Sequence, residues 1–248
     1  MKILLINPNT SPLITNVVVT AARAFAAPGT ELFGATGRFG ARYIVTRAAS
    51  AIAAHAALDA YAEHGANADA VVLACFGDPG LMGLKELAHQ PVIGLAEAAC
   101  LTASALGRRF AIVTGGTRWG PMLEEFVASI GLSQKLAMVK TVAPSGADIA
   151  RDPEGSLTLL ADACNATVRE SGADVVILGG AGLAGLAARI ADRVPVPLID
   201  CVGAGVKLAE ALAALGPVKA REGSFAPTTP VETVGLAAAL AARMTKTY

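Results

Sequence analysis

Short, uniformly apolar runs alternate with longer helical patterns along almost the whole sequence, and this alternation constrains the fold more than any other feature. Six runs rich in Val, Ile and Leu are expected to be strands: residues 2–6, 70–74, 110–113, 136–142, 175–178 and 197–199. Strands that are apolar at successive positions are typical of parallel sheets covered on both faces. The order therefore predicts an α/β protein built from repeated βα units.

Eight longer segments between these runs have the pattern of helices. They are residues 12–25, 46–63, 79–87, 97–106, 120–130, 156–171, 183–192 and 203–215, and residues 229–242 are expected to be partly helical. Ligands of parallel sheets bind beyond the carboxyl ends of the strands. The residues directly after each strand are therefore the first candidates for a functional site.

The sequence repeats itself at the ends of these strands. The aligned pairs are residues 68–75 (ADAVVLAC) with 173–180 (ADVVILGG), 91–94 with 197–200, and 7–10 with 114–117. The repeat predicts two similar lobes, each with a parallel sheet flanked by helices, that face each other across a substrate cleft. We expect residues 1–97 and 207–248 to form lobe one, and residues 98–206 to form lobe two.

Charge and composition exclude several classes of protein. Twenty basic and twenty acidic residues give a formal net charge of zero, which is not the charge balance of a nucleic-acid-binding domain. With 54% hydrophobic and 16% charged residues the chain is not disordered, and its apolar runs fall short of the roughly 20 residues of a membrane span. We expect a cytoplasmic homo-oligomer whose partner is a small molecule, not a nucleic acid or a membrane.

Cys75 directly follows the predicted strand 70–74 and is the strongest candidate for a reactive group. Asp78 and Pro79 are an expected N-cap and first helical residue, so backbone N–H groups and a helix dipole would lie near the sulfur. Such surroundings lower the pKa of a thiol. A free cysteine is also often a small buried hydrophobe, and its position alone leaves both interpretations open.

The turns after the first strand of each lobe carry hydroxyl, amide and N–H groups that could hold a small ligand. These groups belong to Asn7, Asn9, Thr10 and Ser11 in lobe one and to Thr114, Gly115, Gly116 and Thr117 in lobe two. Ser11 before Pro12 is also an ordinary helix start, so capping competes with ligand binding. Residues 179–182 lack the spacing of a dinucleotide loop, and the cysteines and histidines form no metal pattern. We expect neither a metal nor an organic cofactor.

Four stretches of the sequence together resemble the hydantoin racemases. They are residues 6–11 (INPNTS), 74–80 (ACFGDPG), 91–99 (PVIGLAEAA) and 197–200 (PLID). The hydantoin racemases, like allantoin racemase, belong to the Asp/Glu/hydantoin racemase superfamily, and the likeness extends to about Lys207. The resemblance implies two α/β lobes and cofactor-free racemisation of a 5-substituted hydantoin, or of allantoin, in the cleft between the lobes.

The resemblance also implies two catalytic cysteines, one from each lobe, that act on opposite faces of the ring carbon. The first matches Cys75. The second belongs to a Leu-Gly-Cys-Ala-Gly stretch, which here reads LGGAG at residues 178–182, with Gly180 in place of the cysteine. The internal repeat also pairs Gly180 with Cys75, so it locates the gap independently. We therefore expect racemisation to be impaired.

We assign the remaining substrate contacts to both lobes. The expected side-chain groups are Asn9, Thr10, Thr114 and Thr117, and the expected backbone N–H groups are those of Phe76, Gly77, Ala181 and Gly182. Preorganised donors of this kind can stabilise the enolate-like anion of a deprotonated hydantoin by several kcal/mol.

Three explanations of Gly180 stay open. The chain could be an engineered or inactivated racemase, a natural member that uses another group or a one-base reaction, or a binding relative without turnover. Related arylmalonate decarboxylases keep one cysteine, in the second lobe, so a one-thiol decarboxylase or isomerase with the reverse arrangement is an alternative. Cys201 follows the strand 197–199 and could supply the missing thiol, although buried packing is the favoured interpretation.

Overall fold

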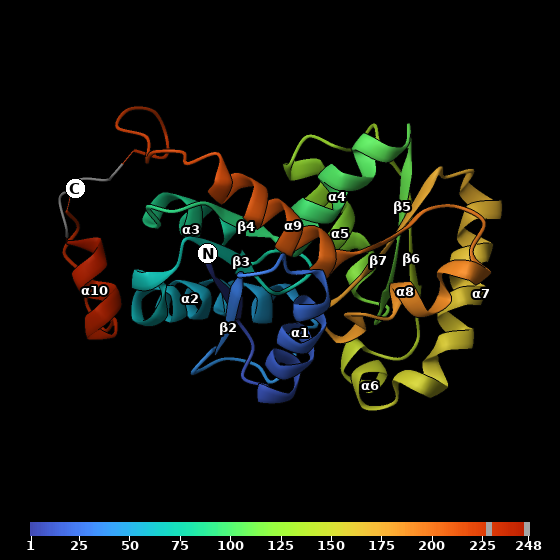
Figure 1. The fold of residues 1–248 in the computed structure, drawn as a ribbon. Coiled ribbons are helices and arrows are strands. Elements are labelled where there is room, and N and C mark those ends of the chain that lie inside the picture. The colour runs from blue at the N-terminus through green and yellow to red at the C-terminus, as the bar shows by residue number, and fades with distance from the viewer. Residues whose placement is uncertain (227–229, 246–248) are drawn as a thin grey trace.

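Two parallel four-stranded sheets with helices on their faces make up the protein (Figure 1). The computed structural model describes residues 1–226 and 230–245. The strands are β1 (Lys2–Asn7), β2 (Glu31–Thr36), β3 (Ala70–Leu73), β4 (Val92–Gly94), β5 (Phe110–Gly115), β6 (Leu136–Val142), β7 (Val175–Gly179) and β8 (Leu198–Asp200). The sheets have the orders β2-β1-β3-β4 and β6-β5-β7-β8, and the recorded strand pairs are parallel. The predicted α/β class is confirmed.

The helices cover these sheets and follow the predicted order closely. They are α1 (Pro12–Phe25), α2 (Arg47–His64), α3 (Leu81–Leu87), α4 (Leu95–Leu106), α5 (Trp119–Ser129), α6 (Gly146–Arg151), α7 (Pro153–Ser171), α8 (Ala187–Ile190), α9 (Cys201–Ala214) and α10 (Ala238–Met244). In α1, Pro12 occupies the first turn, where its missing N–H costs nothing, and Ile14, Val18 and Ala22 form the buried stripe.

The two sheets repeat the same strand order, as the internal sequence repeat predicts. In each sheet the first strand, β1 or β5, lies between the second and third strands. We call each sheet with its flanking helices a lobe. Since parallel strands end at the same edge of a sheet, the loops after β1, β2 and β3 gather at one edge of lobe one. The loops after β5, β6 and β7 gather in the same way in lobe two.

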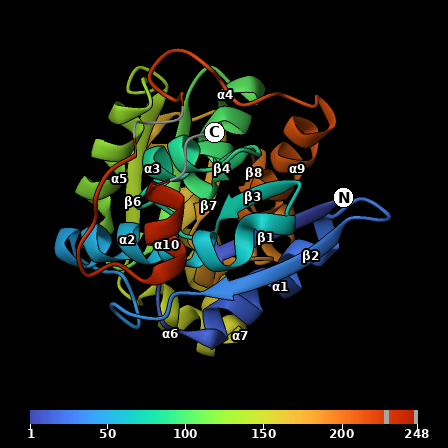
Figure 2. The same cartoon turned by 90° about the vertical axis from the view of Figure 1, so that its left-hand side faces the viewer.

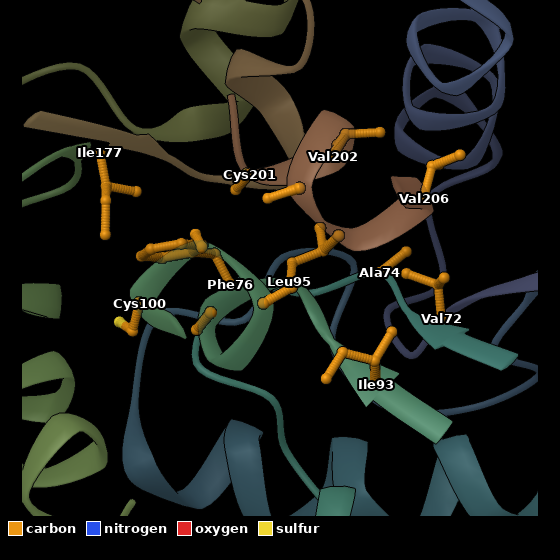
Figure 3. Packing of buried hydrophobic residues seen from close by; sticks show 14 of the residues in the cluster. Val72, Ala74, Phe76, Ile93, Leu95, Cys100, Ile177, Cys201, Val202 and Val206 are labelled. Carbon is orange, nitrogen blue, oxygen red and sulfur yellow. The ribbon is translucent and has the colours of Figure 1, made fainter. Parts of the chain in front are cut away.

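Helices α4 and α9 form a layer that the two lobes share. They pack against each other, and each contacts strands of both sheets. The largest core cluster continues through this layer from β1 and β3 to β5 and β7. Figure 3 shows the ring of Phe76 in this core, close to Ile177 and Cys201. The expected division of the chain, with residues 98–206 as lobe two, cuts through both of these helices, and it stays a prediction.

The C-terminal part of the chain lies against lobe one. Helix α10 packs on α2 (Figure 2). The guanidinium carbon of Arg243 in α10 lies 5.0 Å from the centre of the Tyr61 ring. The expected helix at residues 229–242 is observed from Ala238 onward, and Thr229 lies outside the described residues. In the described ranges, none of the helices has the length and apolar character needed to cross a membrane.

Several elements differ from the sequence-based expectations, and α6 lies in a segment for which the sequence predicts no helix. Strand β2 was not expected, because its half-exposed residues are interrupted by Gly34, where an added Cβ would lie 2.7 Å from Cγ2 of Thr15 in α1. Helix α3 begins at Leu81 and not at Pro79. The expected helix at 183–192 is broken near Gly185, whose φ of +81° interrupts the helical backbone before α8.

Candidate active site

A cavity of about 80 Å³ lies between the carboxyl ends of the two sheets. That volume is well above the roughly 10–15 Å³ that one water molecule requires. Three loops of each lobe line it, with residues Asn9, Tyr43, Ile44, Val45, Cys75 and Phe76 after β1, β2 and β3, and residues Thr114–Gly116, Ser145–Ala147 and Gly180–Leu183 at or after the ends of β5, β6 and β7. Ile14 and Trp119 complete the wall. The equivalent loops of both lobes therefore build one site.

Most of the residues expected to form the site meet at this cavity. Cys75, Gly180, Asn9, Phe76, Thr114, Ala181 and Gly182 line it. Thr10, Gly77 and Thr117 do not belong to its lining. The backbone N–H of Thr10 instead donates to the carbonyl of Ala41, and Gly77 lies under the Trp119 ring, where a Cβ would be 2.7 Å from Cζ3. The roles assigned to all ten residues stay predictions.

The Cys75 thiol is buried in a small apolar cluster with Ile44 and Ala53, against which Trp119 packs. Burial raises the pKa of this thiol far above its usual value, and the nearby Asp78 carboxylate raises the pKa further. The expectation of a lowered pKa is therefore wrong. It assumed that a helix starts next to the sulfur, whereas α3 begins only at Leu81, after Gly80 in a left-handed conformation.

Asp78 does not cap the helix that follows it in sequence. Its carboxylate accepts hydrogen bonds from the N–H groups of Ala96 (3.0 Å) and Glu97 (2.8 Å), in the first turn of α4. Within the described ranges it is the only residue other than glycine with a positive φ, +47°. Burial raises the pKa of Asp78 to about 8, although both N–H groups and Lys85 lower it. This carboxylate therefore ties the loop that carries Cys75 to a helix of the shared layer.

Gly180 lines the side of the cavity that lobe two forms, and an added side chain would be crowded there. A Cβ built on it would lie 3.1 Å from Cδ1 of Leu183 and 3.6 Å from Oγ1 of Thr114. Its φ is +137°, a conformation that residues with a side chain rarely adopt. A Cβ at this position would lie between Leu183 and the Thr114 hydroxyl, and it would require the backbone to change.

The Cys201 thiol lies in the core and not in the lining of the cavity. Cys201 is the first residue of α9, is 1% exposed, and lies close to the Phe76 ring (Figure 3). Burial and the Asp200 carboxylate raise the pKa of Cys201, and the backbone N–H of Gly180 offsets this only in part. Its surroundings are those of a packed core residue.

The cavity offers a neutral environment to a ligand. Among the lining residues that the structure describes there is no Asp, Glu, Lys, Arg or His. The polar side chains are Asn9, Thr114, Ser145 and Tyr43, and the Ser145 hydroxyl is used in the capping box of α6 with Asp148. The lining suits an uncharged ligand, because a buried charge without a partner costs a large free energy.

Sequence reasoning missed the aromatic and apolar wall formed by Tyr43, Ile44, Val45 and Trp119. The loop with Tyr43 follows β2, the strand that was not expected. Lobe two contacts this loop and the helix after it: the Arg151 guanidinium of α6 lies 5.6 Å from the centre of the Tyr43 ring, and Glu125 of α5 forms an ion pair with Arg47 at the start of α2. A signal was available, since Trp119 is the one tryptophan of a chain with only 4% aromatic residues.

Comparison with known proteins identifies the family of this chain. The Asp/Glu/hydantoin racemase family model matches residues 3–209. A hydantoin racemase from Paenarthrobacter aurescens is 36% identical over 231 residues, which are 92% of this chain and 98% of that protein. The crystal structure of allantoin racemase from Pseudomonas fluorescens is 35% identical, with a TM-score of 0.90 over 95% of this chain and 100% of that one.

A more distant structure shares the fold alone. Unliganded arylmalonate decarboxylase is 18% identical, with a TM-score of 0.60 over 90% of this chain and 96% of that chain. The family match covers both sheets and the six loops that line the cavity. The chain therefore belongs to the Asp/Glu/hydantoin racemase family, and racemases are isomerases.

Proposed function

We propose that the protein is a cofactor-independent racemase of 5-substituted hydantoins or of allantoin, with Cys75 as its acid/base thiol. The observation that carries the proposal is the position of Cys75, which is the one cysteine among the described residues that line the cavity. The relatives named as hydantoin racemase and allantoin racemase support this substrate class.

The neutral lining favours a hydantoin over the other substrate types of the superfamily. A free amino acid or a malonate carries charges that need partners in a buried site, whereas a hydantoin ring is uncharged and offers carbonyl and N–H groups. When C5 loses its proton, negative charge develops on a ring carbonyl oxygen. Donors at the cavity, such as the amide of Asn9 and the hydroxyl of Thr114, would stabilise that oxygen.

The raised pKa of Cys75 has two consequences for this reaction. Only a small fraction of the thiol is ionised near neutral pH, but the thiolate that does form is a strong base. The rate of proton removal should therefore rise with pH over the whole range in which the protein stays folded.

Gly180 leaves the opposite face of C5 without a thiol. Proton transfer by a positioned group typically contributes about 10²–10⁴-fold to a rate, so we expect racemisation to be slower by that order than with two thiols. One enantiomer should exchange its C5 proton with retention of configuration, and the other should stay nearly inert. A one-thiol decarboxylase or isomerase and a binding relative without turnover are the alternatives.

Deuterium exchange separates these functions in one experiment. Each enantiomer of 5-benzylhydantoin and of allantoin, and phenylmalonate, is incubated with the protein in deuterated water while optical rotation and isotope uptake are followed. The proposal predicts uptake above the protein-free rate for one hydantoin enantiomer, abolished by Cys75→Ala and unchanged by Cys201→Ser. Loss of CO₂ from phenylmalonate would favour the decarboxylase, and hydantoin binding without exchange would favour the binding relative. Full-speed racemisation in both directions would show that another group supplies the second proton.

A further inference from the structure

A buried hydrogen-bond network follows β1 and surrounds the side chain of Asn7. The two N–H groups of Asn7 Nδ2 are shared among three acceptors: the carbonyl oxygen of Ser11 (3.1 Å), Oδ1 of Asn9 (2.9 Å) and Oγ1 of Thr15 (3.0 Å). Asn7 is 1% exposed. A backbone carbonyl can only accept a hydrogen bond, so the Ser11 carbonyl determines which end of the Asn7 amide is the nitrogen.

The orientation of the Asn9 amide is determined in the same way. Its Oδ1 accepts from the Asn7 Nδ2 and from the backbone N–H of Ser11 at 2.9 Å. A backbone N–H can only donate, so the oxygen of Asn9 must lie on the side of the turn. The nitrogen of Asn9 is then the end that remains for other contacts.

The Nδ2 of Asn9 is available to a ligand. In the described part of the chain no hydrogen bond uses this atom. Asn9 Nδ2 is also not among the fully buried side-chain atoms without a partner, which are Glu97 Oε2 and Ser104 Oγ, so it is accessible from the cavity. Asn9 lines the cavity although it is only 7% exposed. The turn therefore presents an N–H donor, and not an acceptor, to whatever occupies the cavity.

We propose that Asn7 is a positioning residue that holds the Asn9 carboxamide so that its Nδ2 donates to a carbonyl oxygen of the substrate. The inference rests on the proposed function, which supplies a ring carbonyl that gains negative charge when C5 is deprotonated. A rotated amide would place Oδ1 against that oxygen and repel it. Asn7 touches no substrate in this arrangement and acts only through Asn9.

A double-variant cycle tests this indirect role. Loss of one donor to a developing oxyanion typically lowers kcat by about 10²–10³-fold, and we expect Asn9→Ala to lower the kcat of C5 deuterium exchange by that order, with a smaller change in KM. Asn7→Ala should lower kcat about tenfold, because the Ser11 N–H alone still holds the Asn9 oxygen. The variant with both changes should match Asn9→Ala within about twofold, since coupled residues are not additive.

A matched control removes another partner of the same network. Thr15→Val deletes an acceptor of the Asn7 amide without touching Asn9, so it should lower the Tm but leave kcat within about twofold. The proposal is overturned if Asn7→Ala leaves the kcat of the otherwise unchanged protein the same. It is also overturned if adding Asn7→Ala to the Asn9→Ala variant lowers kcat by a further tenfold. A drop in kcat with Thr15→Val equal to that of Asn7→Ala would also overturn it.

A second measurement decides the positioning even if no hydantoin is a substrate. The side-chain NH₂ signals of Asn7 and Asn9 are assigned in nuclear magnetic resonance spectra by their loss in the two Ala variants. The Asn7 protons should exchange slowly with water, and the Asn9 protons should exchange quickly. Asn9 protons as protected as those of Asn7 would refute the orientation, whereas a failure of all hydantoins to bind or exchange would refute only the proposed function.

Discussion

In each lobe one buried carboxylate connects the loop after the third strand to the helix after the fourth strand. The residue that provides this carboxylate lies in the loop in lobe one and at the end of the fourth strand in lobe two. In lobe one, Asp78 lies in the loop after β3 and accepts from two N–H groups at the start of α4. In lobe two, Asp200 ends β8, caps α9 through the N–H groups of Val202 and Gly203, and accepts from Gly185 in the loop after β7 at 2.7 Å. The same connection is therefore made from opposite sides.

Gly94 explains why lobe one has no carboxylate at the position equivalent to Asp200. The repeat aligns Gly94 with Asp200, and a Cβ on Gly94 would lie only 2.1 Å from the carboxyl group of Asp78. Asp78 thus occupies the place that a side chain at position 94 would need. A symmetric fold can conserve an interaction while it moves the residue that provides it to another part of the chain.

The difference also affects the chemistry of the two lobes. In lobe one the carboxylate lies near a thiol that lines the cavity and raises its pKa. In lobe two the position equivalent to Cys75 is Gly180, and the thiol next to Asp200 is the core residue Cys201. Both lobes have this connection, but only in lobe one does the carboxylate lie near a thiol that lines the cavity.

The largest expected effect comes from making the lobes chemically equal. Gly180→Cys should raise racemisation of a 5-substituted hydantoin by about 10²–10⁴-fold, because a thiol would then serve each face of C5. The measurement is the loss of optical rotation of each enantiomer. Since the φ of +137° strains any residue with a Cβ, the folding of the variant is checked by its Tm. A cysteine at the neighbouring position, Gly179→Cys, cannot serve as a control for this variant, because its Cβ would lie only 2.4 Å from the Phe76 ring.

A folded Gly180→Cys variant with a reactive second thiol and no faster racemisation would contradict the one-thiol account. Gly180→Ser is the matched control, since it brings the same strain but a far weaker base. The two variants should differ by most of the expected rise.

A smaller effect is expected from replacing the connecting carboxylate of each lobe, Asp78 or Asp200, with the amide of asparagine. Asp78→Asn removes the negative charge that Asp78 carries near Cys75 above its pKa of about 8. In that range the pKa of the thiol should fall, and its alkylation by iodoacetamide should begin at lower pH. The variant should also lose about 0.5–2 kcal/mol of unfolding free energy, because an amide nitrogen cannot accept from the second N–H of α4. Alkylation rates between pH 7 and 10 and urea unfolding measure the two effects.

Asp200→Asn is the control for this charge exchange. It weakens the equivalent connection in lobe two, so the unfolding free energy should fall by a similar amount, while the alkylation profile of Cys75 stays unchanged. Equal shifts of the Cys75 profile in both variants would show that a general loss of packing, and not the local charge, sets the pKa.

The smallest effect is expected from the C-terminal segment, which contacts lobe one. The Lys219 ammonium donates to the carbonyls of Lys85 and Glu86, each at 2.7 Å, at the C-terminal end of α3. Lys219→Met should lower the unfolding free energy by about 1 kcal/mol, as expected for loss of cationic partners at a helix C-terminus, and leave C5 exchange unchanged. A tenfold loss of exchange would mean that this segment shapes the site and does more than fasten α3.

The features that could be predicted from the sequence are those that repeat or that are locally encoded. Uniformly apolar strands such as β3 and β7 predict a parallel sheet, and their alignment brings the positions of Cys75 and Gly180 to one cavity. The role of Asp78 could not be predicted in the same way. Its partners at Ala96 and Glu97 are distant in sequence, so the local pattern Asp-Pro indicated a cap for the wrong helix.

The walls of the cavity illustrate the same limit. Tyr43 follows β2, a strand whose half-exposed residues give no clear pattern, and Trp119 reaches the cavity from the start of α5. The pKa of Cys75 depends on burial by Ile44, Ala53 and Trp119, which come from three other segments. Proximity of a thiol to a turn in sequence says little about the solvent around it in the folded protein.

The layer formed by α4 and α9 has a consequence for how the chain acquires its structure during synthesis. Helix α9 covers β3 and β4 of lobe one, although its residues follow the whole of lobe two in the sequence. The ribosome therefore releases all the strands of lobe one long before the helix that shields their apolar face. Until residues 201–214 emerge, the part of that face that α9 covers over β3 and β4 remains open to water and to other nascent chains, although α1 and α4 have already been made. Lobe one therefore completes its core only after lobe two has been made.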